Sequence, residues 1–178
     1  MTPPALVDLR PTRLAQVRRA RRADVAGIAA LVAEWAATGL LLPRTAAEVL
    51  AAVDDYVVAV DPAGRVLACA ALREYAPSLA EVVSVAVSGA AQGLGLGGRV
   101  VGAAEELARV RGHAEVFAHT QNPRFFTAIG YECVDHGCYP EKRGRQVSTC
   151  VRRALGGAVA TGAAPARSGP SERLLQAA

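Results

Sequence analysis

Apolar positions recur along this chain in two different periods, and the changes of period mark its predicted elements. Residues 17–22 are a candidate short strand. After Asp24, which we expect to cap a helix, apolar residues follow helical spacing until Gly39 ends the pattern. The bulky apolar residues 40–42 then indicate a loop that packs over something. The segment Thr45-Ala46-Ala47-Glu48 is a capping box, which predicts a second helix to about residue 53.

The middle of the chain changes to the period of strands. Residues 56–60 and 65–72 flank the turn Asp61-Pro62-Ala63-Gly64 and predict a hairpin. Residues 80–87 alternate, which puts Val83, Val85 and Val87 on one expected face and Ser84 and Ala86 on the other. A helix over 99–111, a strand over 114–118, a short helix over 123–129 and strands over 131–134 and 147–152 complete the prediction.

The order of these elements predicts the fold class. It is β-α-α-β-β-β-α-β-α-β-β, which indicates an α+β domain with a mixed, mostly antiparallel sheet and flanking helices. We expect the domain to occupy residues 17–154. Residues 1–16 predict a flexible leader, and residues 155–178, rich in Ala, Gly, Pro and Ser, predict a flexible tail that cannot bury enough apolar surface to fold.

Composition narrows the expected partners. The chain has 178 residues, enough for one domain with a substantial core, and its formal net charge is +4. The basic residues gather in the two flanks rather than on one predicted face, so we predict no nucleic-acid partner. No apolar run reaches the roughly 20 residues of a membrane span, and the first residues do not resemble a secretory signal. The expectation is therefore a cytoplasmic protein without a membrane partner.

The cysteines raise the question of a metal. Cys133, His136 and Cys138 lie close in sequence, and Cys150 could complete a set of four ligands. Their spacing does not match the paired spacing of zinc sites, and disulfides would need an oxidising compartment. We therefore predict reduced, partly buried thiols and no metal.

A glycine-rich loop carries the main chemical signal. Gly93-x-Gly95-x-x-Gly98 matches the dinucleotide fingerprint, but the preceding strand ends at Val87 and does not run into the first glycine. Glycines let successive backbone N–H groups converge, and a helix that starts there adds its positive end, so the loop favours a phosphate. A flexible surface turn is the alternative interpretation.

The strand, loop and helix together resemble the acetyl-CoA motif of the GNAT acetyltransferases. The resemblance rests on Val85-Ala86-Val87 followed by Gln92-x-x-Gly95-x-Gly97, and extends to Phe125-Phe126-x3-Gly130-Tyr131. It implies a GNAT fold and acetyl-CoA as acyl donor. The implied cofactor-binding residues are Val85, Ala86, Val87, Gln92, Gly93, Leu94, Gly95, Leu96, Gly97, Gly98, Arg99 and Phe126, although a solvated helix arginine is the alternative for Arg99.

Within that superfamily the chain is most similar to short N-acetylglutamate synthases. Gly39-Leu40-Leu41-Leu42-Pro43-Arg44 and Pro140-Glu141-Lys142 resemble blocks of that group. The implied reaction is acetyl transfer from acetyl-CoA to the α-amine of an amino acid, L-glutamate first, in arginine biosynthesis. The alternatives are another small amine, a protein N-terminus, or a non-catalytic acetyl-CoA-binding regulator. A homodimer is compatible with this resemblance.

The resemblance also implies roles for single residues. Glu81 matches the family's glutamate and is the candidate base, with a solubilising edge-strand charge as the alternative. Ser84 and Thr120 stand near the expected thioester, and Phe125 and Phe126 replace a tyrosine that many members use as an acid.

The acceptor would be bound mainly through its carboxylates. Arg44 and Arg145 match carboxylate-binding positions, because a guanidinium fork binds a carboxylate through two parallel hydrogen bonds. A surface position is the alternative for Arg44, and a basic turn for Arg145. Ser148 lies one place beyond an expected substrate-binding serine.

Overall fold

The computed structural model describes residues 15–134 and 149–156, and their strands form one seven-stranded sheet. The strands are β1 Gln16–Arg19, β2 Tyr56–Val60, β3 Val66–Ala76, β4 Leu79–Val87, β5 Glu115–Thr120, β6 Glu132–Val134 and β7 Thr149–Ala154. The helices are η1 Arg22–Asp24, α2 Val25–Ala37, α3 Ala46–Ala51, η2 Val53–Asp55, η3 Gly89–Ala91, α4 Leu96–Val110 and α5 Pro123–Ala128. The predicted α+β class and element order are confirmed.

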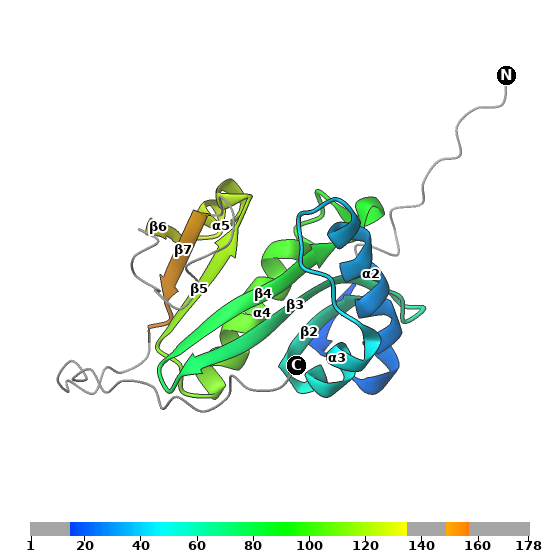
Figure 1. The fold of residues 1–178 in the computed structure, drawn as a ribbon, viewed down its shortest axis with the longest axis horizontal. Helices are drawn as coiled ribbons and strands as arrows, with labels where there is room; N and C mark the ends of the chain where they lie inside the picture. Colours follow the sequence, from blue (N-terminus) through cyan, green and yellow to red (C-terminus); the bar gives the residue numbers. More distant parts are fainter. Residues whose placement is uncertain (1–14, 135–148, 157–178) are drawn as a thin grey trace, which may run out of the picture.

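The sheet is antiparallel except at its centre. Its order is β1-β2-β3-β4-β5-β7-β6, and only β4 and β5 pair in parallel. That pairing lasts for three positions, from Leu79 opposite Glu115 to Glu81 opposite Phe117. Beyond these positions the two strands diverge, and Figure 1 shows them opening into a V.

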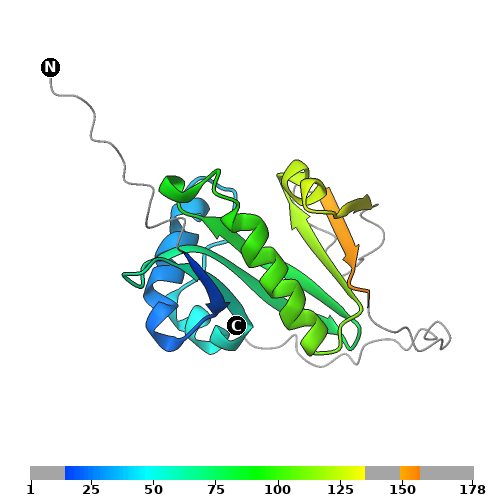
Figure 2. The ribbon, with the colours of Figure 1, turned by 180° about the vertical axis from the view of Figure 1, so that it is seen from behind.

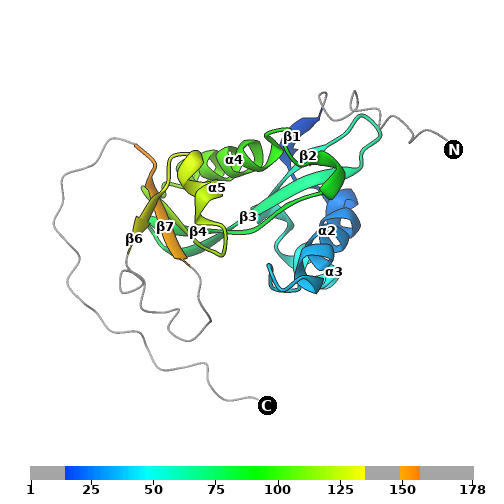
Figure 3. The ribbon, with the colours of Figure 1, turned by 90° about the horizontal axis from the view of Figure 1, so that it is seen from above.

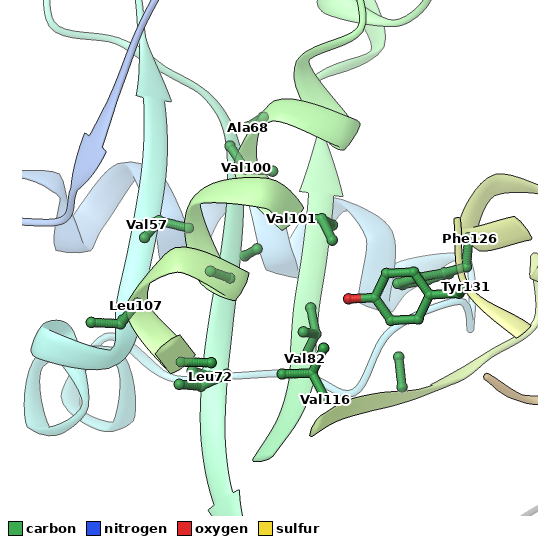
Figure 4. Packing of buried hydrophobic residues seen from close by; sticks show 14 of the residues in the cluster. Val57, Ala68, Leu72, Val82, Val100, Val101, Leu107, Val116, Phe126 and Tyr131 are labelled. Atoms are coloured by element: carbon green, nitrogen blue, oxygen red, sulfur yellow. The ribbon is translucent and has the colours of Figure 1, made fainter. Parts of the chain in front are cut away.

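Helices cover both faces of the sheet. Figure 3 shows α2 and α3 on one face and α4 and α5 on the other, and Figure 2 shows α4 lying along the sheet. Apolar residues of α4, including Val100, Val101 and Leu107, pack on the strands beneath them (Figure 4). A second cluster joins Ile28 and Val32 of α2 to the opposite face.

Local signals in the sequence account for several boundaries. Gly39, in the left-handed region at φ +77°, ends α2 as predicted. At α3, the Thr45 Oγ1 accepts from the Glu48 N–H at 3.2 Å, and Glu48 Oε2 accepts from the Thr45 N–H at 2.7 Å, which confirms the capping box. These bonds form within a few residues, so the sequence alone can specify them.

Other boundaries differ from the prediction. Strand β1 ends at Arg19, and β3 continues to Ala76 because β4 pairs with it along that length. Helix α4 begins at Leu96 rather than 99, so Gly97 and Gly98 lie in its first turn. The predicted leader (1–16) and tail (155–178) lie almost wholly outside the described residues and remain predictions.

Asp24 does not cap α2 as expected. Its side chain makes no capping hydrogen bond and instead accepts two bonds from Arg18, at 2.7 and 2.9 Å, and one from the Arg21 N–H at 2.7 Å. The hydrogen bonds from Arg18 are the main reason that the pKa of Asp24 lies below its usual range. Burial of the carboxyl acts in the opposite direction but is the smaller effect. The residue therefore ties β1 to the start of α2.

The predicted alternation along β4 is wrong. Val83 packs on the α2 face, whereas Val85 and Val87 pack on the α4 face. The cause is a bulge: Cys69 faces Ala86 and Ala71 faces Val83, which leaves two residues of β4 against one of β3. Ser84 in the bulge has φ +53°, in the left-handed region.

The Asp24 pair predicts a defined pH dependence of stability. Because the folded pKa of Asp24 is depressed, its contribution is present above the unfolded pKa of about 3.9 and is lost as pH falls through the folded pKa. Asp24→Asn should lower the free energy of unfolding at pH 7 by about 1–3 kcal/mol and flatten the acid loss of stability in urea titrations. Asp54→Asn, at an exposed acid, is the control and should change neither. An unaltered acid profile in Asp24→Asn would contradict this assignment.

Candidate functional site

The diverging strands enclose a cavity of about 590 Å³. Residues 82–87 of β4 form one wall, and His119 and Thr120 of β5, with Phe125 and Phe126 of α5, form the other. The glycine loop and the start of α4 close one end. A cavity of this size fits a small-molecule site. Along its walls the backbone groups of β4 and β5 are not paired with each other, because the pairing of these two strands ends at Glu81 and Phe117.

The glycine loop has the geometry of an anion cradle. Gly93 and Gly95 have φ +76° and +73°, and a Cβ atom placed on either glycine would meet no atom within 4 Å. The loop backbone is therefore open, and L side chains would be strained there. Gly95 is the N-cap of α4, whose first turn directs backbone N–H groups toward the loop. The cradle fits the diphosphate of a coenzyme A.

Close packing accounts for a further glycine. A Cβ on Gly97 would lie 3.0 Å from Cε2 of Phe125 and 3.4 Å from Cγ2 of Val87. Helix α4 therefore approaches α5 and β4 only because this side chain is absent. Phe126 stacks edge-on against Phe125 and Tyr131, with ring centroids 5.0 and 5.1 Å apart, which fixes this wall of the cavity.

A second cavity, of about 640 Å³, lies on the α3 side of the sheet. Its lining includes Arg44 before α3, Tyr56 of β2 and Arg73 of β3, with Val83 and Ser84 of β4. Val83 and Ser84 also line the first cavity, so the two cavities meet at the bulge of β4. The arrangement suits two reactants that approach one point from opposite sides.

The bulge residue has polar neighbours. The Tyr56 hydroxyl lies 3.5 Å from Ser84 Oγ, and the buried Cys69 thiol donates to the Ser84 carbonyl at 3.4 Å. Burial raises the pKa of Tyr56, with the Ser84 contact opposing it, and burial raises the pKa of Cys69 to about 12. Both groups are therefore neutral hydrogen-bond donors at pH 7. Tyr56 is a phenol near the site that the sequence did not indicate.

Glu81 lies beside the cavities rather than in them. Its side chain is only 2% exposed, and among the described residues it is not part of either lining. Its Oε1 lies 3.5 Å from Nδ1 of His119, and its Oε2 lies 3.9 Å from Nη1 of Arg73. A carboxylate this deeply buried is placed for interactions with particular cations and imidazoles, not for solubility.

Most of the predicted site residues lie together. The first cavity is lined by Ser84, Val85, Ala86, Val87, Gln92, Gly93, Gly95, Leu96, Gly97, Gly98, Thr120 and Phe126, and the second by Arg44 and Ser84. Leu94 instead packs against the α4 core, and Arg99 donates to the Ala15 carbonyl at 2.9 Å. Leu94 and Arg99 therefore do not line either cavity. Arg145 and Ser148 lie outside the described residues.

Several lining residues had no sequence signal as site residues. His119, Gln121 and Trp35 line the first cavity, and Leu40 and Leu41 cover it, in keeping with the apolar loop noted above. Trp35 Nε1 donates to the Val87 carbonyl at 3.0 Å, which ties α2 to the end of β4. A lone histidine or tryptophan gives no pattern, because only the fold brings it to the cavity.

In residues 15–134 and 149–156 no group of three or more His, Cys, Asp or Glu side chains could hold a metal. His136 and Cys138 fall outside that part of the chain. Within the same ranges no helix combines the length and apolarity needed to cross a bilayer.

Known sequences provide an independent comparison. Residues 26–131 match the acetyltransferase (GNAT) family. An uncharacterized N-acetyltransferase of Chlorobaculum tepidum is 34% identical over 137 residues, covering 77% of this chain and 88% of that protein. An amino-acid acetyltransferase of Mycobacterium tuberculosis is 35% identical over 126 residues. That match covers 70% of this chain and 70% of that protein.

A solved structure extends the comparison to a complex. N-acetylglutamate synthase from Neisseria gonorrhoeae, complexed with coenzyme A and N-acetyl-glutamate, has a TM-score of 0.74 and 27% identity. The match covers 80% of this chain but 35% of the synthase, so the chain spans about a third of that protein's length.

These findings agree with the cleft, the glycine cradle and the strand order. The Neisseria gonorrhoeae synthase and a Mycobacterium tuberculosis protein that is 26% identical both hold coenzyme A in their solved structures, in agreement with the predicted acyl donor. Since the family match covers well over half of the chain and includes both the cradle and the divergent strands, this chain belongs to the acetyltransferase (GNAT) family.

Proposed function

We propose that this acetyltransferase moves the acetyl group of acetyl-CoA to the α-amine of a free amino acid, L-glutamate first. The observation that carries the proposal is the meeting of two cavities at Ser84, one with a glycine cradle and the other with arginines. The reaction would be an early step of arginine biosynthesis in the cytoplasm. The relatives named as an amino-acid acetyltransferase and an N-acetylglutamate synthase support this choice.

The first cavity is the donor side in this proposal. The amides at Gly93 to Gly98 bind the diphosphate, and the backbone of Val85 to Val87 pairs with the extended acyl arm, as a strand would. The same backbone amides would polarise the thioester carbonyl. Ser84 and Thr120 line this cavity and supply further hydroxyl donors near the reacting carbon.

The second cavity is the acceptor side. Arg44 and Arg73 both line it, and their side chains are 24% and 43% exposed, accessible to a ligand. Glutamate carries two carboxylates, and each guanidinium fork can bind one of them through paired hydrogen bonds. Arg145 remains our second predicted carboxylate ligand, together with Ser148, from the part of the chain outside the described residues.

The chemistry requires a base because an α-ammonium has no lone pair to attack a thioester. Glu81 is our predicted base, and its burial in the sheet, in contact with His119 and Arg73 of the two cavity linings, supports a part for it in the proton transfer. Burial excludes water from the carboxylate and strengthens its interaction with the proton-carrying group.

Acceptor choice is tested by following thiol release from acetyl-CoA with each free amino acid and with N-terminal peptides. We expect glutamate to have the highest kcat/KM. Activity with another amine and none with glutamate would remove the glutamate assignment and leave the acetyltransferase. Binding of coenzyme A without turnover on any acceptor would favour a regulator instead.

The cradle predicts a specific effect on coenzyme A binding. Gly95→Ala places a side chain at φ +73°, which distorts the loop amides, so we expect the Kd for coenzyme A in calorimetry to rise by roughly tenfold. The matched control is Gly102→Ala in the same helix, where a Cβ meets nothing within 4 Å and alanine favours the helix. Equal affinity in wild type and Gly95→Ala would refute the cradle.

The acceptor site predicts a selective kinetic change. Arg44→Met removes a carboxylate ligand, so KM for glutamate should rise by about tenfold or more, while the KM for acetyl-CoA stays the same. Arg22→Met removes the same charge from an exposed position outside both linings and is the control. If both variants keep the wild-type KM for glutamate, Arg44 is not a substrate ligand.

A further inference from the structure

The position of Glu81 leaves a gap in the proposed mechanism. Its carboxylate is buried to 98% and is separated from both cavity linings in the described residues. A substrate amine therefore needs another group to accept its proton. That group must line a cavity and also contact Glu81.

His119 meets both conditions. It lines the donor cavity near the mouth of the V, and its Nδ1 lies 3.5 Å from Oε1 of Glu81. Its side chain is 15% exposed, and the Nδ1 atom itself is buried. The ring thus has one nitrogen at the carboxylate, while Nε2 lies at the opposite edge of the imidazole.

The sheet explains why these two residues meet. Glu81 is paired with Phe117 at the last parallel position, and His119 lies two residues further along β5, on the same face as Phe117. The Phe117 ring packs edge-on against His119, with centroids 5.7 Å apart, and restricts its orientation.

We propose that His119 is the catalytic base that contacts the substrate amine, and that Glu81 is the residue that positions it. This inference rests on the proposed function, since it concerns the same amine acetylation. Because Oε1 of Glu81 lies 3.5 Å from Nδ1, the proposal assigns the proton of the neutral ring to Nδ1, facing the carboxylate, and the acceptor lone pair to Nε2. The resulting imidazolium is stabilised by the carboxylate that faces it.

The proton and electron balance follows from this arrangement. The α-ammonium gives one proton to Nε2, and its lone pair forms the C–N bond to the thioester carbonyl carbon while the C=O π pair moves to oxygen. That pair then re-forms C=O, the C–S bond breaks with its electrons on sulfur, and the thiolate takes the second amine proton through water. His119 releases the first proton to solvent. The products are the N-acetyl amino acid, the coenzyme A thiol and one proton.

The groups that face His119 within the described residues favour this role. Arg73 of β3 lies on the far side of Glu81, at 3.9 Å from Oε2, so it stabilises the carboxylate without contacting the imidazole in its place. Across the β5–β7 ladder His119 is opposite Cys150, a buried thiol. The Glu81 carboxylate faces the imidazole at 3.5 Å.

The first test needs no turnover. In ¹⁵N NMR of the full chain, the neutral His119 ring should carry its proton on Nδ1, and Glu81→Gln should shift the population toward the Nε2–H tautomer. His119→Gln assigns the signals, and Glu115→Gln, a carboxylate on the same sheet at 32% exposure, is the control that should leave them unchanged. An Nε2–H tautomer in wild type would overturn the proposal.

The second test uses the pH profile of kcat/KM with the best acceptor. His119→Gln should lower kcat/KM by about 100-fold and remove the acid limb between about pH 5 and 8, with coenzyme A affinity retained. Glu81→Gln should lower kcat/KM by roughly tenfold or more and displace the acid limb of the pH profile. Glu115→Gln should change neither kcat/KM nor the limb. A wild-type profile in His119→Gln would overturn the base assignment. Absence of turnover with every amino acid would instead refute the proposed function, and the NMR test would still decide the Glu81–His119 contact.

Discussion

The parallel pairing of β4 with β5 for only three residues is the constraint on which the site depends. A strand leaves backbone N–H and C=O groups that must find partners, so two strands that separate in the middle of a sheet create a place where another extended chain can pair. The α4 helix packs along β2, β3 and β4 on one side of this opening (Figure 2). The proposed acetyl-CoA site is therefore a gap in strand pairing that the rest of the domain maintains.

The bulge at Ser84 lies where the two cavities share lining residues. An extra residue in β4 reverses the faces of Val85 and Val87, so the end of the strand presents its apolar side chains to α4. Two residues at this bulge, Val83 and Ser84, line both cavities. A serine at φ +53° costs of order 1–2 kcal/mol, and such strain persists where the surrounding contacts hold it. Here Tyr56 and Cys69 contact the bulged residue from the neighbouring strands.

Contacts distant from the reacting atoms keep the walls in place. Trp35 holds the end of β4 through its bond to the Val87 carbonyl, and Gln121 donates to the Gly39 carbonyl at 3.2 Å across the mouth of the donor cavity. Phe125 contacts the position where Gly97 lacks a side chain. These contacts orient the glycine cradle, the segment after Gly39 and the two strands relative to one another before any ligand binds, which lowers the entropy lost on binding.

The sequence by itself determined the features that are encoded over a few residues. The Thr45 capping box, the Gly39 helix end and the glycine cradle each depend on residues adjacent in the chain, and so do the order and type of the elements. The face of each β4 side chain, the meeting of Glu81 with His119 and the sharing of Ser84 by two cavities were decided only by the tertiary structure. Their physical reason is strand register: one bulged residue reverses every side chain beyond it, and only the pairing of separate strands sets where that residue falls.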